Sequence, residues 1–168
     1  MAVIANQTRL LLAERPALRD HLHGAWWPRS GDIAKELAPL LRAVTSRARV
    51  VGVALNRDEW PDAPLVLQPL PTTRGPKISW YGLTEPHLAM LYCSGHNQIA
   101  LLVLPPDTPE EVALTAMLMA AAPGNCLTTT ETLARASEHV RPTGPTKLIR
   151  SGEVRAPLTK LRPARPAL

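Results

Sequence analysis

The sequence contains no phenylalanine, and its aromatic residues are four tryptophans and two tyrosines among 168 residues. It has only two cysteines, Cys93 and Cys126, which lie far apart and do not suggest a disulfide framework. The apolar runs at residues 10–13 and 112–122 are both shorter than the roughly 20 residues of a membrane-spanning helix. We therefore expect a cytoplasmic protein with reduced thiols and no membrane contact.

Motifs of the common enzyme classes are also missing. The chain has no Gly-x-Ser-x-Gly elbow, no phosphate-binding glycine loop and no dinucleotide fingerprint. The adjacent acids Asp58 and Glu59 could serve as an acid and base pair, but before Trp60 and Pro61 they are more typical of a solvated strand exit. The sequence favours a protein that is not an enzyme and predicts no cofactor.

Metal ligation has weak support. His21-x-His23 and Cys93-x-x-His96 would supply imidazole and thiolate ligands if the fold brought them together. Their spacing does not require a shared site, and the usual partnered ligand pairs are missing. We therefore predict no metal site.

Positive charge is concentrated at the carboxyl terminus. Residues 141–168 carry seven basic groups against one acid, Glu153, whereas the preceding residues carry 12 basic and 13 acidic groups. Because this segment also has five prolines and no aromatic residue, we expect one domain over residues 1–140 and a disordered or loosely packed basic tail over residues 141–168. Such a tail could bind nucleic acid without sequence specificity, through Arg141, Lys147, Arg150, Arg155, Lys160, Arg162 and Arg165.

The amino-terminal part predicts an amphipathic helix over residues 31–47. Its apolar face follows the helical period, with Ile33, Leu37, Leu40, Leu41 and Val44. Ser30 is expected to cap the helix and Asp32 to lie in its first turn. Pro39 predicts a kink or a restart within the helix.

Short strand-like runs follow this helix, over residues 50–55, 65–68, 77–83, 88–93 and 99–104. The turn at residues 94–97 predicts a hairpin between the last two runs, and the unbroken apolar run at 99–104 predicts a strand covered on both faces. A second helix is expected to begin at Asp107 or Thr108, with Pro109 in its first turn. It should pack through Val112, Leu114, Met117, Leu118 and Ala121, and a short third helix is expected over 129–140. The expected fold is α+β: a mainly antiparallel sheet of five or six strands with two main helices on one face.

Several of these segments resemble a known family. GAWWPRS, an Asp and a leucine-rich helix, then Trp60 and Pro64, then LLVLPPDT and AAAPGN follow one another in consistent order over roughly residues 9–125. This order resembles an actinobacterial family of unknown function. The resemblance implies a small cytoplasmic domain and no particular activity or catalytic residue. The family pattern has Asp-Gly where this chain has His23-Gly24.

The adjacent Trp26 and Trp27 should point in different directions, so at most one is expected to face the core fully. The other could form a wall of a site that binds a small anion at the helix start, with Arg29 and the backbone amides after Ser30 as donors. The candidate ligand residues are therefore Trp26, Trp27, Arg29, Ser30 and Asp32. Alternatively, these residues form only a rigid entry into the helix.

Three functions remain open at this point. A non-enzymatic module that binds a protein partner or a second copy of itself is favoured. The alternatives are an enzyme or sensor for a small anionic ligand at Trp27, Arg29 and Ser30, and an accessory nucleic-acid binder that uses the tail.

Overall fold

The computed structural model describes residues 8–14, 22–64, 75–82, 85–95 and 97–140. Within these ranges six strands form one sheet in the order β1-β2-β6-β5-β3-β4. They are β1 (Arg9–Leu12), β2 (Gly24–Trp27), β3 (Val50–Asn56), β4 (Lys77–Tyr81), β5 (Leu88–Cys93) and β6 (Gln98–Val103). The helices are α1 (Ile33–Thr45), the short 3-10 helix η1 (Arg57–Glu59), α2 (Glu110–Ala120) and α3 (Thr129–Val140).

The sheet is mixed, so the expectation of a mainly antiparallel sheet is wrong. β2 pairs with β6 in parallel, and β3 pairs with β4 in parallel, while the other neighbours are antiparallel. Turn residues reveal local hairpins, and the predicted hairpin between β5 and β6 is present, with Gly95 at φ +82°. Parallel pairs need long connections, which leave no comparable signature in the sequence.

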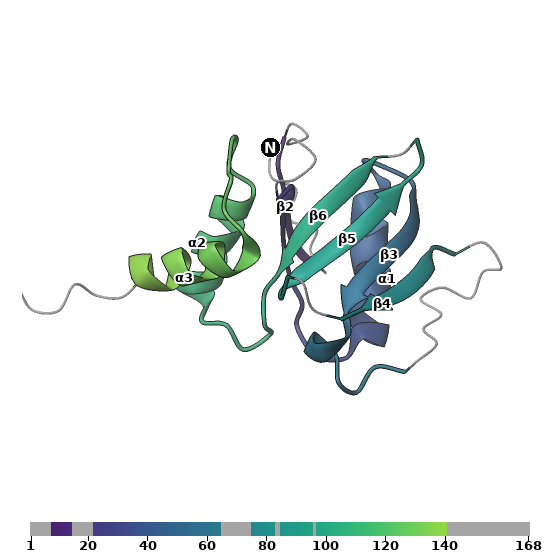
Figure 1. Cartoon of the computed structure of the whole chain (residues 1–168), viewed down its shortest axis with the longest axis horizontal. Helices are drawn as coiled ribbons and strands as arrows, with labels where there is room; N and C mark the ends of the chain where they lie inside the picture. The colour runs from purple at the N-terminus through teal and green to yellow at the C-terminus, as the bar shows by residue number, and fades with distance from the viewer. Residues whose placement is uncertain (1–7, 15–21, 65–74, 83–84, 96, 141–168) are drawn as a thin grey trace, which may run out of the picture.

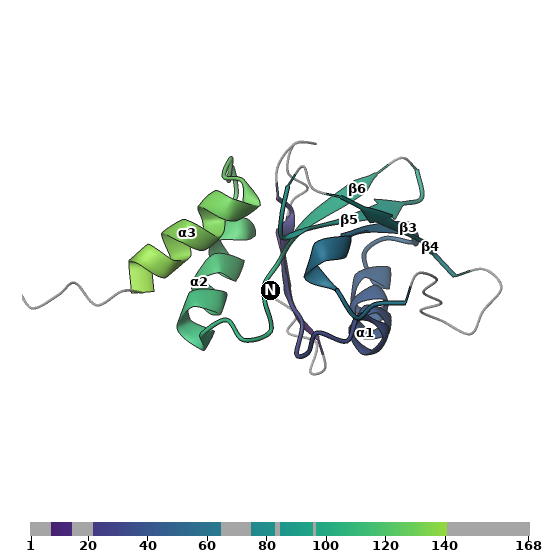
Figure 2. The same cartoon turned by 60° about the horizontal axis from the view of Figure 1, so that its bottom comes forward.

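The helices lie on both faces of the sheet, contrary to the expectation of two helices on one face. Figures 1 and 2 show α1 on one side and α2 with α3 on the other. Strand residues alternate between the two sides: Leu101 belongs to the buried cluster beneath α1 and Leu102 to the cluster beneath α2 and α3. The prediction that this strand is covered on both faces is confirmed.

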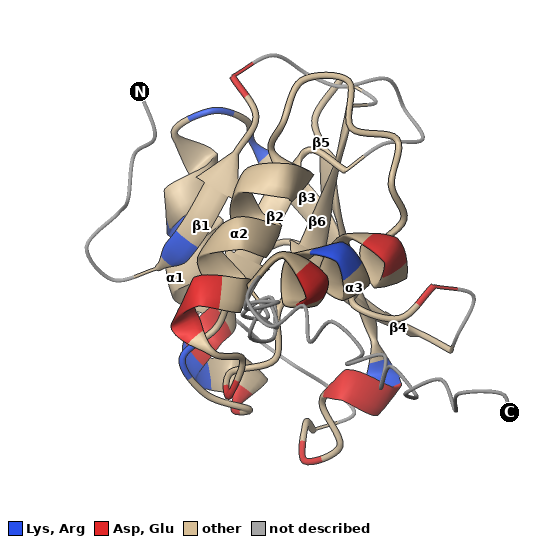
Figure 3. Ribbon diagram, turned by 90° about the vertical axis from the view of Figure 1, so that its left-hand side faces the viewer, with Lys and Arg blue, Asp and Glu red and all other residues tan. Residues whose placement is uncertain are grey.

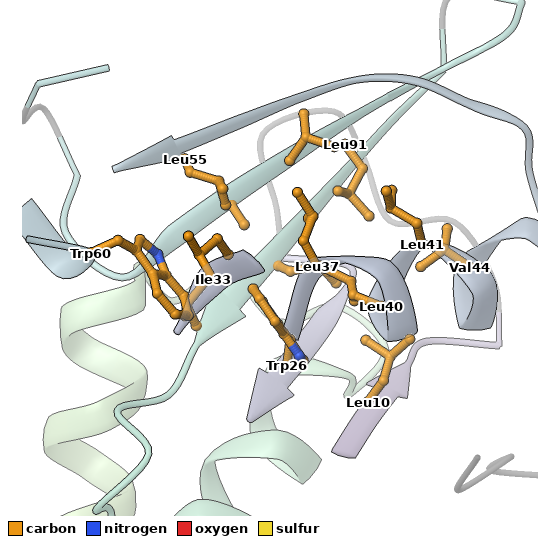
Figure 4. Close-up of a cluster of buried hydrophobic side chains, with 14 of the residues drawn as sticks. Leu10, Trp26, Ile33, Leu37, Leu40, Leu41, Val44, Leu55, Trp60 and Leu91 are labelled. Carbon is orange, nitrogen blue, oxygen red and sulfur yellow. The ribbon is translucent and has the colours of Figure 1, made fainter. Parts of the chain in front are cut away.

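Helix α1 follows its prediction closely. Its buried residues are the five that the periodicity selected, and Figure 4 shows them in the buried cluster that also contains Trp26 and Trp60. Asp32, not Ser30, is the N-cap, and its side chain accepts a hydrogen bond from the Ala34 amide at 3.1 Å. Pro39 lies inside one continuous helix, so the expected restart does not occur.

The predicted packing face of α2 is only partly correct, because Met117 is buried as expected but the leucines are not. The buried residues are Ala113, Ala116, Met117 and Ala120, whereas Leu114 and Leu118 are 49% and 67% exposed. The alanines allow α2 to approach both the sheet and α3 closely, so small residues form the buried side. The third helix has the predicted bounds.

Strands β1 and β2 were not predicted, and their pairing depends on Gly24. This glycine has φ +152°, and a Cβ atom there would lie 2.1 Å from the Leu11 carbonyl oxygen of β1. Only glycine fits such a close approach of two backbones. The strand expected at 65–68 and the tail at 141–168 lie outside the described residues. No described helix is long and apolar enough to cross a membrane.

Candidate functional site

The two adjacent tryptophans are both buried, which corrects the expectation that only one would face a core. Trp26 is fully buried beneath α1 and stacks on Trp60, with ring centroids 5.7 Å apart. Trp27 is 7% exposed and packs in the cluster beneath α2 and α3. Because β2 has helices on both sides, each indole has its own core.

Arg9 covers the remaining surface of Trp27. Its guanidinium carbon lies 3.4 Å from the ring centroid, and its Nε donates to the Trp27 carbonyl oxygen at 3.0 Å. The Nη2 of Arg9 donates to the Pro28 carbonyl oxygen at 2.5 Å. Burial and then the nearby charge of Arg29 lower the pKa of Arg9. The ring of Trp27 therefore packs against Arg9 and does not form the wall of an open ligand site.

The start of α1 has internal partners for its polar groups. The Asp32 carboxylate caps the helix and pairs with Lys35 at 2.8 Å, and this contact lowers the pKa of Asp32. The Ser30 hydroxyl donates to Glu36 at 2.9 Å, while Arg29 is exposed. An acid of the chain thus lies where the anion was expected. The anion site at Trp27, Arg29 and Ser30 stays a prediction, because none of these three residues lines the pocket described next.

A pocket of about 280 Å³ lies beside this helix start. It is bounded by the segment before α1, by η1, by the residue before β5 and by the segment after β6. Its lining residues are Pro28, Gly31, Asp58, Glu59, Trp60, His87, Val103, Leu104, Pro105 and Pro106. Val103 belongs to the α1 cluster and Leu104 to the α2 and α3 cluster, so the pocket lies where the two cores meet at the end of the sheet.

Glu59 and His87 form the polar centre of the pocket. The Glu59 side chain is only 15% exposed, and its Oε1 accepts a hydrogen bond from the backbone amide of His87. The His87 Nδ1 lies 3.5 Å from the same oxygen. Local structure fixes both residues, since the Asn56 side chain caps η1 and the Val103 amide donates to the His87 carbonyl oxygen at 2.7 Å.

His87 has a backbone conformation that few side chains adopt. Its φ is +61°, whereas the other positive φ angles among the described residues belong to glycines. Non-glycine residues in this region cost roughly 1 kcal/mol or more and often occur at functional sites. Here the conformation directs the His87 amide at the Glu59 carboxyl group.

The surroundings change the ionisation of both groups. Burial raises the pKa of Glu59 to about 7, with a further rise from Asp58 and an opposing effect of the His87 amide hydrogen bond. Burial lowers the pKa of His87. Near neutral pH the imidazole is therefore uncharged and does not neutralise the carboxylate. The site can accept hydrogen bonds, exchange a proton or pair with an external cation.

Sequence reasoning identified Asp58 and Glu59 but treated them as a solvated strand exit. Asp58 is exposed as expected, whereas the Glu59 side chain is only 15% exposed in the pocket. His87 carried no signal, because the chain fold alone brings it to an acid 28 positions earlier.

The indole Nε1 of Trp60 is buried without a hydrogen-bond partner among the described atoms.

Two of the four residues considered for a metal site, His23 and Cys93, lie in the described part of the chain. His23 is buried, and its Nδ1 accepts from the Ala100 amide at 3.2 Å. Cys93 is buried, and burial raises the pKa of its thiol. His21 and His96 lie outside the described residues. Among those described, no three potential ligands form a group that could hold a metal ion.

A mixed six-stranded sheet with helices on both faces and an acidic pocket at its end defines a small α+β domain with a potential ligand site. The chain belongs to a family of unknown function (DUF5994), whose model matches residues 9–120. This range includes α1, α2 and every residue that lines the pocket, but not α3. No curated protein and no solved structure matches the chain.

Proposed function

We propose that this protein is a non-enzymatic binding module that holds a small ligand in the pocket at Glu59 and His87. The observation that carries the proposal is a poorly exposed carboxyl group in a pocket with mainly apolar walls. Ligand sites commonly combine apolar walls with a few fixed polar groups. The volume of about 280 Å³ suits a small metabolite rather than a large cofactor. The resemblance to an actinobacterial family supports a cytoplasmic role.

Glycine positions allow a direct test. Gly31 lines the pocket, and a Cβ atom there would meet nothing within 4 Å. Leucine at this position should fold normally and narrow the pocket. Gly82 is equally open but does not line the pocket, so Gly82→Leu is a matched control.

The experiment is a protein-observed NMR screen of small fragments with the labelled full-length chain. We expect bound fragments to shift the Trp60 indole signal and the amides of His87 and Val103. Gly31→Leu should abolish these shifts, and Gly82→Leu should leave them unchanged. Fragment shifts that map elsewhere, or that survive in Gly31→Leu, would show that the pocket is not the binding site.

A homodimer is the second candidate. Val51 and Tyr92 are 48% and 40% exposed on strands β3 and β5, and Leu114 and Leu118 are exposed on α2. Association with a second copy would cover such exposed apolar side chains. Analytical ultracentrifugation should then find a dimer that Tyr92→Lys or Leu118→Glu converts to a monomer. A wild-type monomer at high concentration would exclude this candidate.

A further inference from the structure

The chemistry of the pocket lining limits the charge of its ligand. Among the described residues that line it, the titratable side chains are two carboxyl groups and one imidazole, and none is a lysine or an arginine. An anion would face Asp58 and Glu59 without a basic partner among these residues. The pocket therefore disfavours the anionic ligand that was expected at the neighbouring helix start.

The Glu59 carboxyl group has few polar partners among the described residues. One described hydrogen bond reaches it, from the His87 amide. The His87 imidazole also lies near, but its lowered pKa keeps it neutral near pH 7. A partly buried carboxylate with a single neutral donor is poorly compensated. A ligand ammonium group would supply both a charge and additional donors.

The remaining walls define the rest of the ligand. Trp60, Val103, Leu104 and three prolines line the same pocket as the Glu59 carboxyl group. Aromatic and proline rings present flat apolar surfaces that pack against a hydrocarbon body. The pocket thus combines a carboxyl group that can pair with a cation and apolar walls that can contact a compact hydrocarbon group.

We infer that the pocket takes a small organic amine, whose ammonium group pairs with the Glu59 carboxylate and whose apolar body contacts Trp60 and the prolines. This inference rests on the proposed function, because it names the ligand class of the same pocket. Asp58, which is exposed at the rim of the pocket, adds electrostatic attraction for the ammonium group.

The proposed contact implies that affinity depends on pH. The free carboxyl group has a pKa of about 7, so below this value a cation must first displace a proton. Affinity for an amine should therefore rise between pH 6 and pH 8. The other titratable neighbours do not reverse this trend: His87 is neutral, and burial together with Glu59 and Glu85 raises the pKa of Tyr81 to about 12, so Tyr81 also stays neutral.

Three probes of similar shape but different charge test whether charge decides binding. They are benzylamine, benzyl alcohol and benzoate. Each is titrated at pH 8 into the labelled full-length chain while the Trp60 indole and His87 amide signals are followed. We expect benzylamine to bind most tightly and benzoate not to bind. Glu59→Gln keeps an oxygen that can accept from the His87 amide, and it should weaken benzylamine binding about tenfold. Asp62→Asn removes an exposed acid outside the pocket lining and should change nothing.

The outcomes distinguish the ligand class from the binding function. Equal binding of benzylamine and benzyl alcohol, unchanged in Glu59→Gln, would overturn the amine while the pocket remained a ligand site. Tighter binding of benzoate would likewise overturn it. If none of the probes shifts a pocket signal at millimolar concentration, and the fragment screen also finds no pocket ligand, both the amine and the proposed function fail.

Discussion

The two faces of the sheet are built from different side chains. Large residues fill the α1 face, where Trp26, Leu37, Leu40 and Leu55 are fully buried. The cluster on the opposite face also contains Trp27 and leucines from the sheet side, but four of its five helical residues are alanines, which let α2 and α3 lie close together and close to the sheet: Ala113, Ala116, Ala120 and Ala136. Burial of large apolar groups stabilises the first face, whereas close approach defines the second. Removing atoms should therefore damage the α1 face, and adding atoms should damage the α2 and α3 face.

The largest expected effect comes from truncation on the α1 face. Trp26→Ala removes a fully buried indole that stacks on Trp60, so the free energy of unfolding should fall by about 3–5 kcal/mol. Urea denaturation followed by circular dichroism measures this change. Trp80→Ala on the edge strand β4, where the indole is only partly buried, is the control and should cost clearly less. Equal losses in both variants would contradict the difference in burial.

Enlargement on the opposite face should cost less. Ala116 is fully buried in α2, and Ala116→Leu should lower the free energy of unfolding by about 1–3 kcal/mol, because the added atoms force α2 away from the sheet or α3. Thermal and urea unfolding would both report it. The control is Leu118→Ala in the same helix, measured at a concentration at which the chain is monomeric. Leu118 is 67% exposed, and its truncation should then change stability by less than about 0.5 kcal/mol. A neutral Ala116→Leu would mean that space is available beside α2.

The same difference explains how much of the fold could be predicted from sequence. Helix α1 was predictable because its large apolar residues repeat with the helical period and all five are buried. In α2 the predicted face included Leu114 and Leu118, but Met117 and three alanines form the buried side. Apolar size alone does not show which side of a helix approaches its neighbours closely. Strands β1 and β2 were missed because each has only four residues and pairs through a contact that Gly24 permits.

The pocket was only partly predictable for a related reason. Asp58 and Glu59 were visible as neighbouring acids, but the partial burial of Glu59 depends on residues after β6 and before β5. Those segments meet η1 only in the folded mixed sheet. The expected ligand residues at 26–32 lie nearby, yet Pro28 and Gly31 line the pocket while the tryptophans of β2 are buried in the two cores.

The pocket should also affect how stability depends on pH. The folded pKa of Glu59, about 7, lies above its ordinary value of 4.5, so ionisation weakens the fold. This penalty is absent below pH 4.5, grows between pH 4.5 and 7, and is constant above pH 7. The full shift corresponds to about 3 kcal/mol, but solvent at the pocket mouth screens it, and we expect about 1–2 kcal/mol.

Glu59→Gln should therefore stabilise the chain at pH 8.5 and leave its stability nearly unchanged at pH 4. Urea unfolding at several pH values gives the difference between variant and wild type. Asp62→Asn serves as the control, because this acid is exposed and its removal should not produce the same step near pH 6. A constant difference across the pH range would show that Glu59 does not carry the raised pKa.

The smallest predicted effect concerns α3, which reaches the pocket indirectly. The hydroxyl of the fully buried Thr129 donates to the Pro86 carbonyl oxygen at 2.6 Å, and the Thr129 amide donates to Glu85 at 3.1 Å. These contacts connect α3 to the segment that carries His87. In Figure 3, acidic residues mark the first turn of α2, whereas both acidic and basic residues occur along α3.

Thr129→Val keeps the shape of the side chain but leaves the Pro86 carbonyl without this donor, which should cost about 1 kcal/mol. Because the lost contact is local, hydrogen exchange should accelerate in α3 and at His87 while the amides of α1 keep their protection. Thr130→Val changes the exposed neighbouring residue and should leave exchange unaltered. If Thr129→Val instead loosens α1 and α3 equally, the two faces unfold as a single cooperative unit, and their different construction has no separate effect on local stability.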